Sequence, residues 1–449
     1  MHKANCYDCA ESNIILHAFD WPYAKIAEQA ATIKAFGYKS VLISPPMKSL
    51  VHAKGTQWWQ RYQPQDYRVI DNQLGDTLDF KAMIEALTQY DLWLYVDVVF
   101  NHMANEHHLR EDLQYPSADE MAHYQSHQSR YDKLCLFGDL SQPLFTEGDF
   151  AEAFGIEDWK DRWQVQNGRI SAGPDDPGLP TLKDNDHVVT QQKNYLKALK
   201  ALGVRGFRID AAKHMTLDHL TKVWTPDITD GLHIFGEIIT DGGATEDEYE
   251  LFLQPYLENT TLGAYDFPLF STVFDAFQPE GDLTSLIDPY SLGQALSKSR
   301  AITFGVTHDI PNNDVFLDKV MDESAEWLAH AYLLGRDGGV PLIYADLDTS
   351  GIKGANGQPR WVDAWKDKRM QALNLFYHRM HGLRMEITAP SETALMIDRE
   401  RQGFVLINKS DVPETFTLPI EAGHCLLTKS SVTSEVVVPA NSFKLVFTN

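Results

Sequence analysis

The chain has 449 residues, of which 43% are hydrophobic and 11% are aromatic. This length and composition allow a barrel-sized catalytic domain with one or two smaller units, and they exclude a disordered chain. Lysine and arginine number 39 against 63 aspartates and glutamates, so the formal net charge is −24. Such an acidic surface repels phosphate backbones and anionic lipid head groups, so we expect neither nucleic acid nor a membrane as a partner.

Targeting signals are missing from the sequence as it stands. The first 30 residues show no basic segment followed by an apolar one, and no run of about twenty apolar residues occurs. We therefore expect a cytoplasmic monomer, or a secreted or periplasmic protein if a leader was removed.

The four cysteines, Cys6, Cys9, Cys135 and Cys425, are too few for a disulfide framework in a chain of this length. Cys6 and Cys9 have the spacing of a metal or redox pair, but no second pair of this kind follows. We expect no functional role for them.

Short apolar or β-branched runs alternate with amphipathic helical patterns through most of the chain. In chain order the predicted strands span residues 13–19, 40–44, 92–99, 204–209, 233–237, 263–267, 301–307 and 340–344. Helical periodicity fills several intervals, at 24–36, 79–89, 190–202 and 323–334. Eight strands with helices between them predict an α/β fold, the (β/α)8 TIM barrel.

Two departures from this alternation predict additional domains. A polar stretch rich in Pro and Gly follows the third strand, so we expect the barrel to comprise 1–102 and 184–384, with an inserted subdomain at 103–183. Residues 385–449 are expected to form a C-terminal antiparallel β-sandwich domain. Its predicted strands include 394–397, 403–407, 414–418 and 443–447.

Polar residues gather where four of the predicted strands end. They are Asp97, Asn101 and His102 on the third strand, Arg208 and Asp210 on the fourth, Glu237 on the fifth, and His308 and Asp309 on the seventh. In a (β/α)8 barrel the carboxyl ends of the strands face the active site. We therefore expect these side chains to meet at one mouth of the barrel.

Carboxylates that are crowded together repel each other, so at least one pKa should rise. Glycoside hydrolysis uses this outcome, because one carboxylic acid must stay protonated while another carboxylate attacks. Arg208 and Asp210 are two residues apart and point to the same side of a strand. The arginine would keep Asp210 ionised and oriented.

Four short motifs carry a resemblance to a known family. They are DVVFNH at 97–102, GFRIDAAKH at 206–214, GEII at 236–239 and VTHD at 306–309. In this order and spacing they resemble the four motifs of the α-amylase family of glycoside hydrolases, and the match covers most of the chain. The resemblance implies retaining, endo-acting hydrolysis of α-1,4-glucosidic bonds in starch, glycogen or maltooligosaccharides by double displacement.

The resemblance also implies roles for single residues. Asp210 matches the nucleophile, Glu237 the general acid/base and Asp309 the third carboxylate. His102 and His308 match histidines that bind the sugar, and Arg208 matches the arginine beside the nucleophile. The remaining substrate-side residues are Asp97, which would brace this network, the stacking aromatics Tyr62, Trp58 and Trp59, and the leaving-group pair Lys213 and His214.

Two ions are associated with the family. Asn101 and the backbone carbonyl of His214 match two calcium ligands, but Thr181 stands where an aspartate is usual, and Asp184 or Asp186 would have to replace it. The sequence therefore leaves calcium open. Pro341 stands where chloride-dependent members have a basic residue, so chloride is not expected. Thr307 replaces the usual Asn before His-Asp, which implies altered substrate contacts.

Three alternatives remain open. An exo-acting α-glucosidase, a maltogenic enzyme or a transglycosylase would share the chemistry and differ only in its loops. An inactive carbohydrate-binding scaffold would usually lack one of the three carboxylates. A metal-dependent barrel hydrolase is suggested by His102, Glu106, His107 and His108, although no clear pair of helical ligands occurs there.

Overall fold

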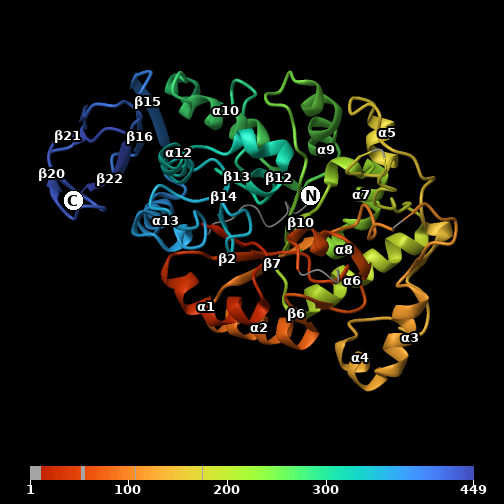
Figure 1. The fold of residues 1–449 in the computed structure, drawn as a ribbon. Coiled ribbons are helices and arrows are strands. Elements are labelled where there is room, and N and C mark those ends of the chain that lie inside the picture. The colour runs from red at the N-terminus through yellow and green to blue at the C-terminus, as the bar shows by residue number, and fades with distance from the viewer. Residues whose placement is uncertain (1–11, 52–55, 107, 174, 449) are drawn as a thin grey trace.

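The computed structural model describes residues 12–51, 56–106, 108–173 and 175–448. The eight predicted barrel strands are all present, and every neighbouring pair is parallel in a closed barrel (Figure 1). Their bounds are β1 (Ile15–Ala18), β2 (Ser40–Ile43), β7 (Trp93–Val98), β10 (Gly206–Ile209), β11 (His233–Gly236), β12 (Gly263–Tyr265), β13 (Ala301–Phe304) and β14 (Val340–Ala345). The predicted fold class is confirmed.

Helices surround the barrel (Figure 1). The principal ones are α1 (Tyr23–Ala35), α2 (Thr77–Gln89), α6 (Asp186–Leu202), α7 (Leu217–Val223), α8 (Pro226–Thr229), α9 (Gln254–Asn259), α10 (Phe267–Phe277), α12 (Glu323–Gly335) and α13 (Lys368–Met380). Local sequence explains their ends. Asp76 accepts two backbone N–H bonds at the start of α2, and Gly203 ends α6 with a left-handed φ of 111°.

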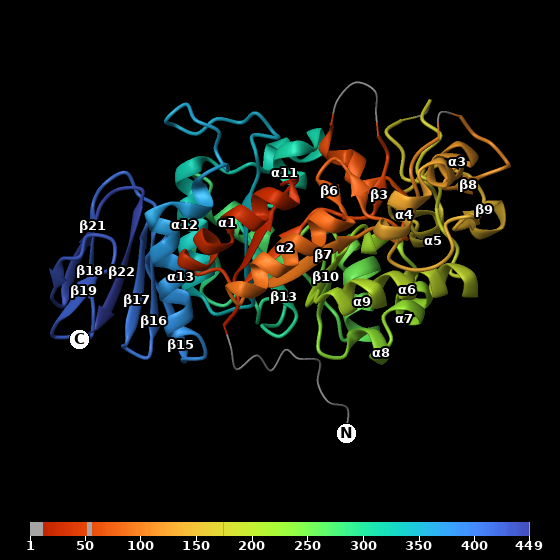
Figure 2. The ribbon, with the colours of Figure 1, turned by 90° about the horizontal axis from the view of Figure 1, so that it is seen from below.

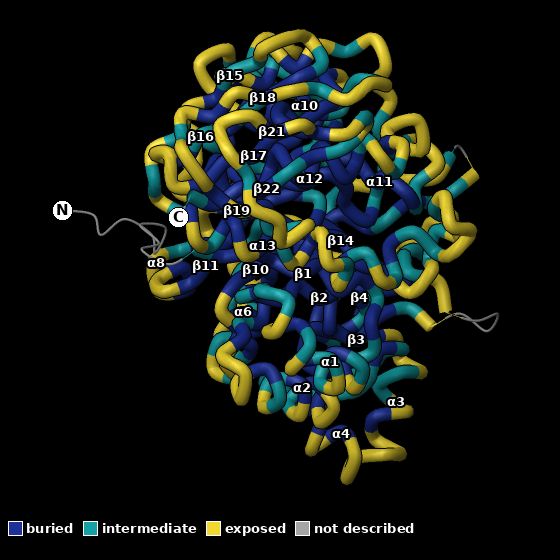
Figure 3. The backbone as a smooth tube through the Cα atoms, turned by 90° about the vertical axis from the view of Figure 1, so that its left-hand side faces the viewer, coloured by how far each residue is buried: buried dark blue, intermediate teal, exposed yellow. Residues whose placement is uncertain are grey.

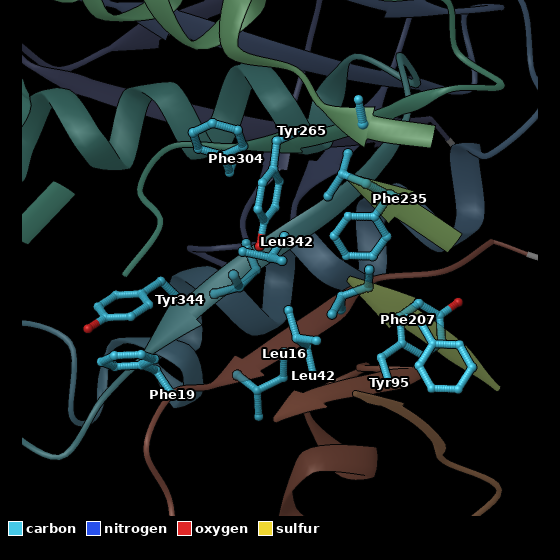
Figure 4. Packing of buried hydrophobic residues seen from close by; sticks show 14 of the residues in the cluster. Leu16, Phe19, Leu42, Tyr95, Phe207, Phe235, Tyr265, Phe304, Leu342 and Tyr344 are labelled. Atoms are coloured by element: carbon cyan, nitrogen blue, oxygen red, sulfur yellow. The ribbon is translucent and has the colours of Figure 1, made fainter. Parts of the chain in front are cut away.

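The barrel is filled by apolar side chains, most of them fully buried. Figure 4 shows the ring of Tyr265 between those of Phe235 and Phe304, and its centroid lies 5.3 Å from each. Leu16, Leu42 and Leu342 belong to the same buried cluster. In Figure 3 the strands and the helix faces that pack on them are buried, whereas exposed residues concentrate on the outer turns. The barrel is thus a packed core that can hold strand ends in fixed positions.

The long connection between β7 and α6 carries its own short elements. These are β8 (Gln114–Tyr115), α3 (Ala118–Ser126), α4 (Gln128–Leu134), β9 (Phe145–Thr146) and α5 (Arg162–Asn167). They project from the side of the barrel away from the C-terminal sheet in both ribbon views (Figures 1 and 2). A backbone bridge between His102 and Thr181 closes the base of this insertion, next to the end of β7.

The C-terminal region is antiparallel. One sheet contains β15 (Met385–Ser391), β16 (Ala394–Arg399), β17 (Gly403–Asn408), β22 (Ser442–Thr448), β19 (Gly423–Cys425) and β20 (Ser431–Val432), and a second contains β18 (Glu414–Thr417) and β21 (Glu435–Val438). All four segments predicted as strands here are strands. One face of the larger sheet packs on the barrel helices, where Phe447 stacks on Phe376 of α13 at 5.6 Å (Figure 2).

Among the described residues no helix is both long and apolar enough to cross a membrane.

Candidate active site

The site is organised around one guanidinium, that of Arg208 on β10. Its Nη1 donates to Asp97 Oδ2 at 2.6 Å and to Asp210 Oδ1 at 2.8 Å. Its Nη2 is bonded to Glu237 and lies 4.0 Å from Asp309 Oδ2. The Arg208 side chain has no exposed surface. Four carboxyl groups from four strand ends therefore meet at one buried cation, as the strand-end argument predicts.

One cation cannot neutralise four carboxylates, and this imbalance shifts their pKa values. Burial raises the pKa of Asp97, Asp210, Glu237 and Asp309, and the charge of Arg208 opposes the rise in each case. A hydrogen bond with Asp309 further raises the pKa of Glu237 and lowers that of Asp309. Glu237 thus holds its proton at a pH at which an isolated glutamate is ionised.

The turn that follows Asp210 helps to hold Glu237. Ala211 has a left-handed backbone with a φ of 47°, which costs an L-residue about 1–2 kcal/mol. In this conformation its N–H donates to Glu237 Oε2 at 3.2 Å, and the N–H of Lys213 donates to the Glu237 carbonyl at 3.2 Å. The strained turn therefore fixes both the backbone and the carboxyl group of Glu237.

An aromatic wall lies beside the carboxylates. The Tyr62 hydroxyl donates to Asp97 Oδ2 at 2.9 Å, and its ring lies nearly parallel to that of His308, with centroids 5.2 Å apart. Phe19 also stacks on His308, with centroids 4.7 Å apart. Trp58 meets the rings of Tyr62 and His308 edge-on, while the neighbouring Trp59 is half-buried in the same short helical segment. This wall is a packed cluster of aromatic rings beside the carboxyl groups.

Burial and the nearby Arg208 lower the pKa of His308 to about 3, so its imidazole is neutral near pH 7. His102 is also buried, and burial lowers its pKa although Asp210 opposes the shift. Its Nε2 lies 3.0 Å from the Tyr62 carbonyl, and its Nδ1 lies 3.4 Å from Asn101 Nδ2. In this structure His102 therefore supports the backbone of the aromatic wall.

Lys213 and His214 lie directly after the turn, but each side chain is already engaged. Lys213 forms an ion pair with Glu248, a residue of the loop after β11. His214 Nδ1 lies 3.0 Å from the Val165 carbonyl of α5. Burial, with the charge of Lys213, lowers the pKa of His214 to about 3. The pair thus links the segment after Asp210 to the insertion and to the loop that follows Glu237.

Two neighbours of the site escaped the sequence argument. Phe19 follows the end of β1, and its position at a strand end is the one sequence signal that could have found it. Glu248 lies eleven positions after Glu237 in an acidic loop, and no local pattern distinguishes it from the acidic residues around it.

The residues aligned with calcium ligands do not fit a tight calcium site. Ca²⁺ prefers six to eight oxygens that include carboxylates. Thr181 offers only a hydroxyl, which donates to the Gly168 carbonyl at 2.9 Å, and the side-chain nitrogen of Asn101 lies 3.4 Å from His102 Nδ1. The two acidic substitutes are placed elsewhere, because Asp184 pairs with Lys222 at 2.8 Å and Asp186 is exposed at the start of α6.

No group of three or more His, Cys, Asp or Glu side chains suited to a metal ion occurs within the described part of the chain. Glu106 forms an ion pair with Arg110 instead. Of the residues considered for metal or redox chemistry, Cys6, Cys9 and His107 lie outside the described residues.

A cavity of about 930 Å³ lies at the opposite end of the barrel, near the starts of β13 and β14. Its lining includes Lys298, Arg336, Asp337 and His381, and none of the predicted site residues contributes to it. The carboxyl groups predicted at the strand ends gather instead in the cluster around Arg208. We therefore assign the candidate site to that cluster.

Comparison with known proteins identifies the family that this chain resembles. The family model described as the catalytic domain of alpha amylase matches residues 24–250. An alpha-amylase from Aeromonas hydrophila is 44% identical over 413 residues, which cover 91% of this chain and 87% of that protein. An alpha-amylase from Clostridium acetobutylicum is 28% identical over 420 residues, covering 89% of this chain and 48% of that one.

Solved structures show the same fold. A mutant of alpha-amylase I from Eisenia fetida, solved in complex with maltohexaose, superimposes with a TM-score of 0.79. The superposition covers 98% of this chain and 97% of the other at 20% sequence identity.

Proposed function

The chain belongs to the alpha-amylase family of glycoside hydrolases, and we propose that it is a retaining, endo-acting enzyme that cleaves α-1,4-glucosidic bonds. The substrate would be starch, glycogen or a maltooligosaccharide. A neutral glucan suits a protein with a net charge of −24, which would repel an anionic polymer.

In the first step a carboxylate oxygen of Asp210 attacks the anomeric carbon, and the bond from this carbon to the glycosidic oxygen breaks. Glu237 gives its proton to the departing oxygen. In the second step Glu237 accepts a proton from water, the water oxygen bonds to the anomeric carbon, and the ester to Asp210 breaks. Asp309 would bind sugar hydroxyls, and its hydrogen bond with Glu237 would keep that residue protonated at the start.

The observation that carries this proposal is the shared contact of Asp210 and Glu237 with the two terminal nitrogens of Arg208. Retaining enzymes hold the two carboxyl groups about 5–5.5 Å apart, whereas inverting enzymes leave about 6.5–9.5 Å for a water molecule. Two carboxyl groups bridged by one guanidinium support the close arrangement. We expect a pyranose ring bound beside the carboxyl groups to contact the ring of Tyr62, which is held by His308 and by its hydroxyl bond to Asp97.

The test is to follow soluble starch and maltoheptaose by NMR and chromatography with the wild type, Asp210→Asn and a matched control, Asp363→Asn. Asp363 is a suitable control because its side chain is 72% exposed, unlike the buried carboxyl groups around Arg208. We expect mixed oligosaccharides, released first as α-anomers, with turnover reduced at least 10⁴-fold in Asp210→Asn and unchanged in the control.

Other outcomes separate the alternatives. Release of one small sugar from chain ends, or transfer of glycosyl units to an acceptor, would keep Asp210 in its role and replace endo-hydrolysis by an exo or transferase activity. Initial β-anomers would refute retention. No turnover of any α-glucan by the wild type would refute the hydrolase and favour a binding scaffold.

A further inference from the structure

The cavity of about 930 Å³ at the amino ends of the barrel strands lies where three parts of the molecule meet. The loop before β13 contributes Ser297, Lys298 and Ser299, and the segment between α12 and β14 contributes residues 336–339. The end of α13 and the start of β15 line it from the C-terminal side. Tyr290 in the lining is 56% exposed, so the cavity opens to solvent. Its size is that of a small-molecule site, which typically measures about 300–1,000 Å³.

One cation in the lining lacks a partner. Arg336 follows the end of α12 and is only 6% exposed, yet its Nη1 has no hydrogen-bond partner among the described residues. Burying a charged donor without a partner is unfavourable, so such a donor in a folded protein usually has an ion, a water molecule or a ligand beside it. Because Arg336 lines the cavity, a ligand held there can supply the partner.

The backbone next to Arg336 is shaped to receive its guanidinium. A Cβ atom placed on Gly338 would lie 2.6 Å from Arg336 Cζ, which is closer than side chains approach each other in proteins. The N–H of Gly338 also donates to the Arg336 carbonyl, which closes the turn between α12 and β14. The absence of a side chain at Gly338 therefore allows the guanidinium to lie against the main chain at the cavity wall.

The carboxylates that share the cavity do not match the charge of Arg336. Asp337 is already bonded to two other cations, Lys298 and Arg399. Asp288, the other carboxylate in the lining, is exposed and accepts a backbone N–H instead. The cavity thus keeps one positive charge that an incoming anion can neutralise.

The donors around the cavity suit an oxyanion. A guanidinium presents its N–H groups in a fork that matches the paired oxygens of a phosphate or carboxylate. Ser297 and Ser299 add two hydroxyls, whose oxygens lie 3.4 Å apart. The acidic surface of the protein does not prevent binding, because exposed charges more than about 8 Å away are largely screened at physiological ionic strength. The cavity is far larger than one oxyanion group, so it also has room for an organic body.

We propose that this cavity binds a small organic anion whose phosphate or carboxylate group pairs with Arg336. The site lies at the opposite end of the barrel from the cluster around Arg208, so its ligand would not compete with a glucan. Its walls come from both the barrel and the C-terminal region, so a bound ligand would also stabilise their contact. The inference goes beyond the proposed function and does not depend on it.

The experiment measures binding to the full chain by isothermal titration calorimetry and by the shift in Tm. The probes are glucose 1-phosphate, citrate, inorganic phosphate and glucose, the last being the neutral counterpart of the first. We expect the wild type to bind at least one organic anion with a Kd below about 1 mM, and more tightly than inorganic phosphate. Arg336→Met should raise this Kd at least about tenfold, and Gly338→Ala, which displaces the guanidinium, should raise it as well.

A second pair of variants tests the cavity without touching a buried residue. Ser299 is exposed, so Ser299→Asp should fold normally and place a negative charge in the lining. We expect it to raise the Kd at least about fivefold, whereas Ser299→Asn should stay within about twofold of the wild type. Arg130→Met is the matched control for charge, because it removes an arginine that is 52% exposed on α4, and it should leave the Kd unchanged.

Three results would overturn the proposal. The first is a wild type that binds neither glucose 1-phosphate nor citrate. The second is an unchanged Kd in both Arg336→Met and Ser299→Asp, which would place the anion elsewhere on the protein. The third is an affinity for inorganic phosphate equal to that for the organic anions, which would leave a simple anion site. None of these readouts depends on hydrolysis, so loss of the proposed function and loss of this site can be told apart.

Discussion

Two buried ion clusters lie at opposite ends of the barrel and use the same kinds of side chain in reversed proportions. At the carboxyl ends of the strands, Arg208 is shared by four carboxyl groups. Near the start of β14, the single carboxylate of Asp337 contacts four donors. These are Lys298 at 2.5 Å, the N–H of Gly382 at 2.7 Å, His381 at 3.0 Å and Arg399 of β16 at 3.4 Å.

The two clusters shift the pKa of their carboxyl groups in opposite directions. Around Arg208, burial raises the carboxyl pKa values and one cation cannot offset it for all of them. Burial also acts on Asp337, but the hydrogen bonds from His381, Lys298 and Gly382 outweigh it and hold its pKa well below the usual value. The first arrangement keeps a proton available for chemistry at some cost in stability. The second joins the C-terminal sheet to the barrel and contributes stability.

The largest expected effect is that of Arg208→Met. Among the described residues Arg208 is the only Lys or Arg in contact with the four carboxyl groups. Its removal leaves them to repel one another, so Asp210 can no longer be kept ionised beside Glu237. We expect kcat for maltoheptaose to fall about 10³-fold. Arg208→Lys keeps the positive charge but cannot contact several carboxyl groups through two nitrogens, so its kcat should fall less. A kcat for Arg208→Met within tenfold of the wild type would contradict the central role of this cation.

The next effect is on stability, from Asp337→Asn. This change leaves the buried Arg399 without its carboxylate, and breaking a buried ion pair typically costs about 3–5 kcal/mol. We expect calorimetry to show a Tm several degrees lower, with kcat within twofold of the wild type. Asp348→Asn is the matched control, because its pair with Lys353 is exposed and should contribute less than about 1 kcal/mol. An unchanged Tm in Asp337→Asn would remove the contrast between the clusters.

The pH dependence of Tm should have opposite signs at the two clusters. The folded pKa of Asp337 is lowered, so its contribution is present above the unfolded value of about 4 and is lost as pH falls. The Tm difference between wild type and Asp337→Asn should therefore shrink below about pH 4. The folded pKa of Asp97 is raised, so ionising it costs stability as pH rises. The Tm of Asp97→Asn should rise relative to the wild type as pH increases above about 4.

The smallest effect concerns the insertion, where the residues aligned with calcium ligands include no carboxylate. We expect EDTA to shift the Tm of the wild type by less than about 1 °C. Thr181→Asp would add the missing negative charge at the backbone bridge to His102, next to Asn101 in sequence, and its Tm should rise by a few degrees with added Ca²⁺. A large loss of Tm in the wild type on chelation would show that other oxygens complete a site.

Much of the fold and of the candidate site could be predicted from the sequence. Strand periodicity gives the eight barrel strands, and in a parallel barrel all strand ends face the same mouth, so Asp97, Asp210, Glu237 and Asp309 were expected to converge. The two-residue spacing of Arg208 and Asp210 likewise predicts their contact. These features depend on local pattern and on one general rule of barrel geometry.

Other contacts depend on side-chain packing between distant segments, which no local pattern encodes. The pairing of Lys213 with Glu248 depends on the path of the loop after β11. The contact between Asp337 and Arg399 depends on how the C-terminal sheet is placed against α12 and α13. Phe19 stacks on His308 because the end of β1 lies beside the segment that follows β13. The identity of the two residues does not indicate this contact.

The closing pair of the barrel has a consequence for synthesis in the cell. Ile15 of β1 pairs with Ser40 of β2 on one side and with Leu342 of β14 on the other. At about 5–20 residues per second, a ribosome needs roughly 15–60 seconds to travel from β2 to β14. During that time one edge of β1 has no native neighbour, and an open edge invites pairing with other chains. The nascent barrel therefore needs protection until β14 emerges, and we expect active enzyme to appear only after that point.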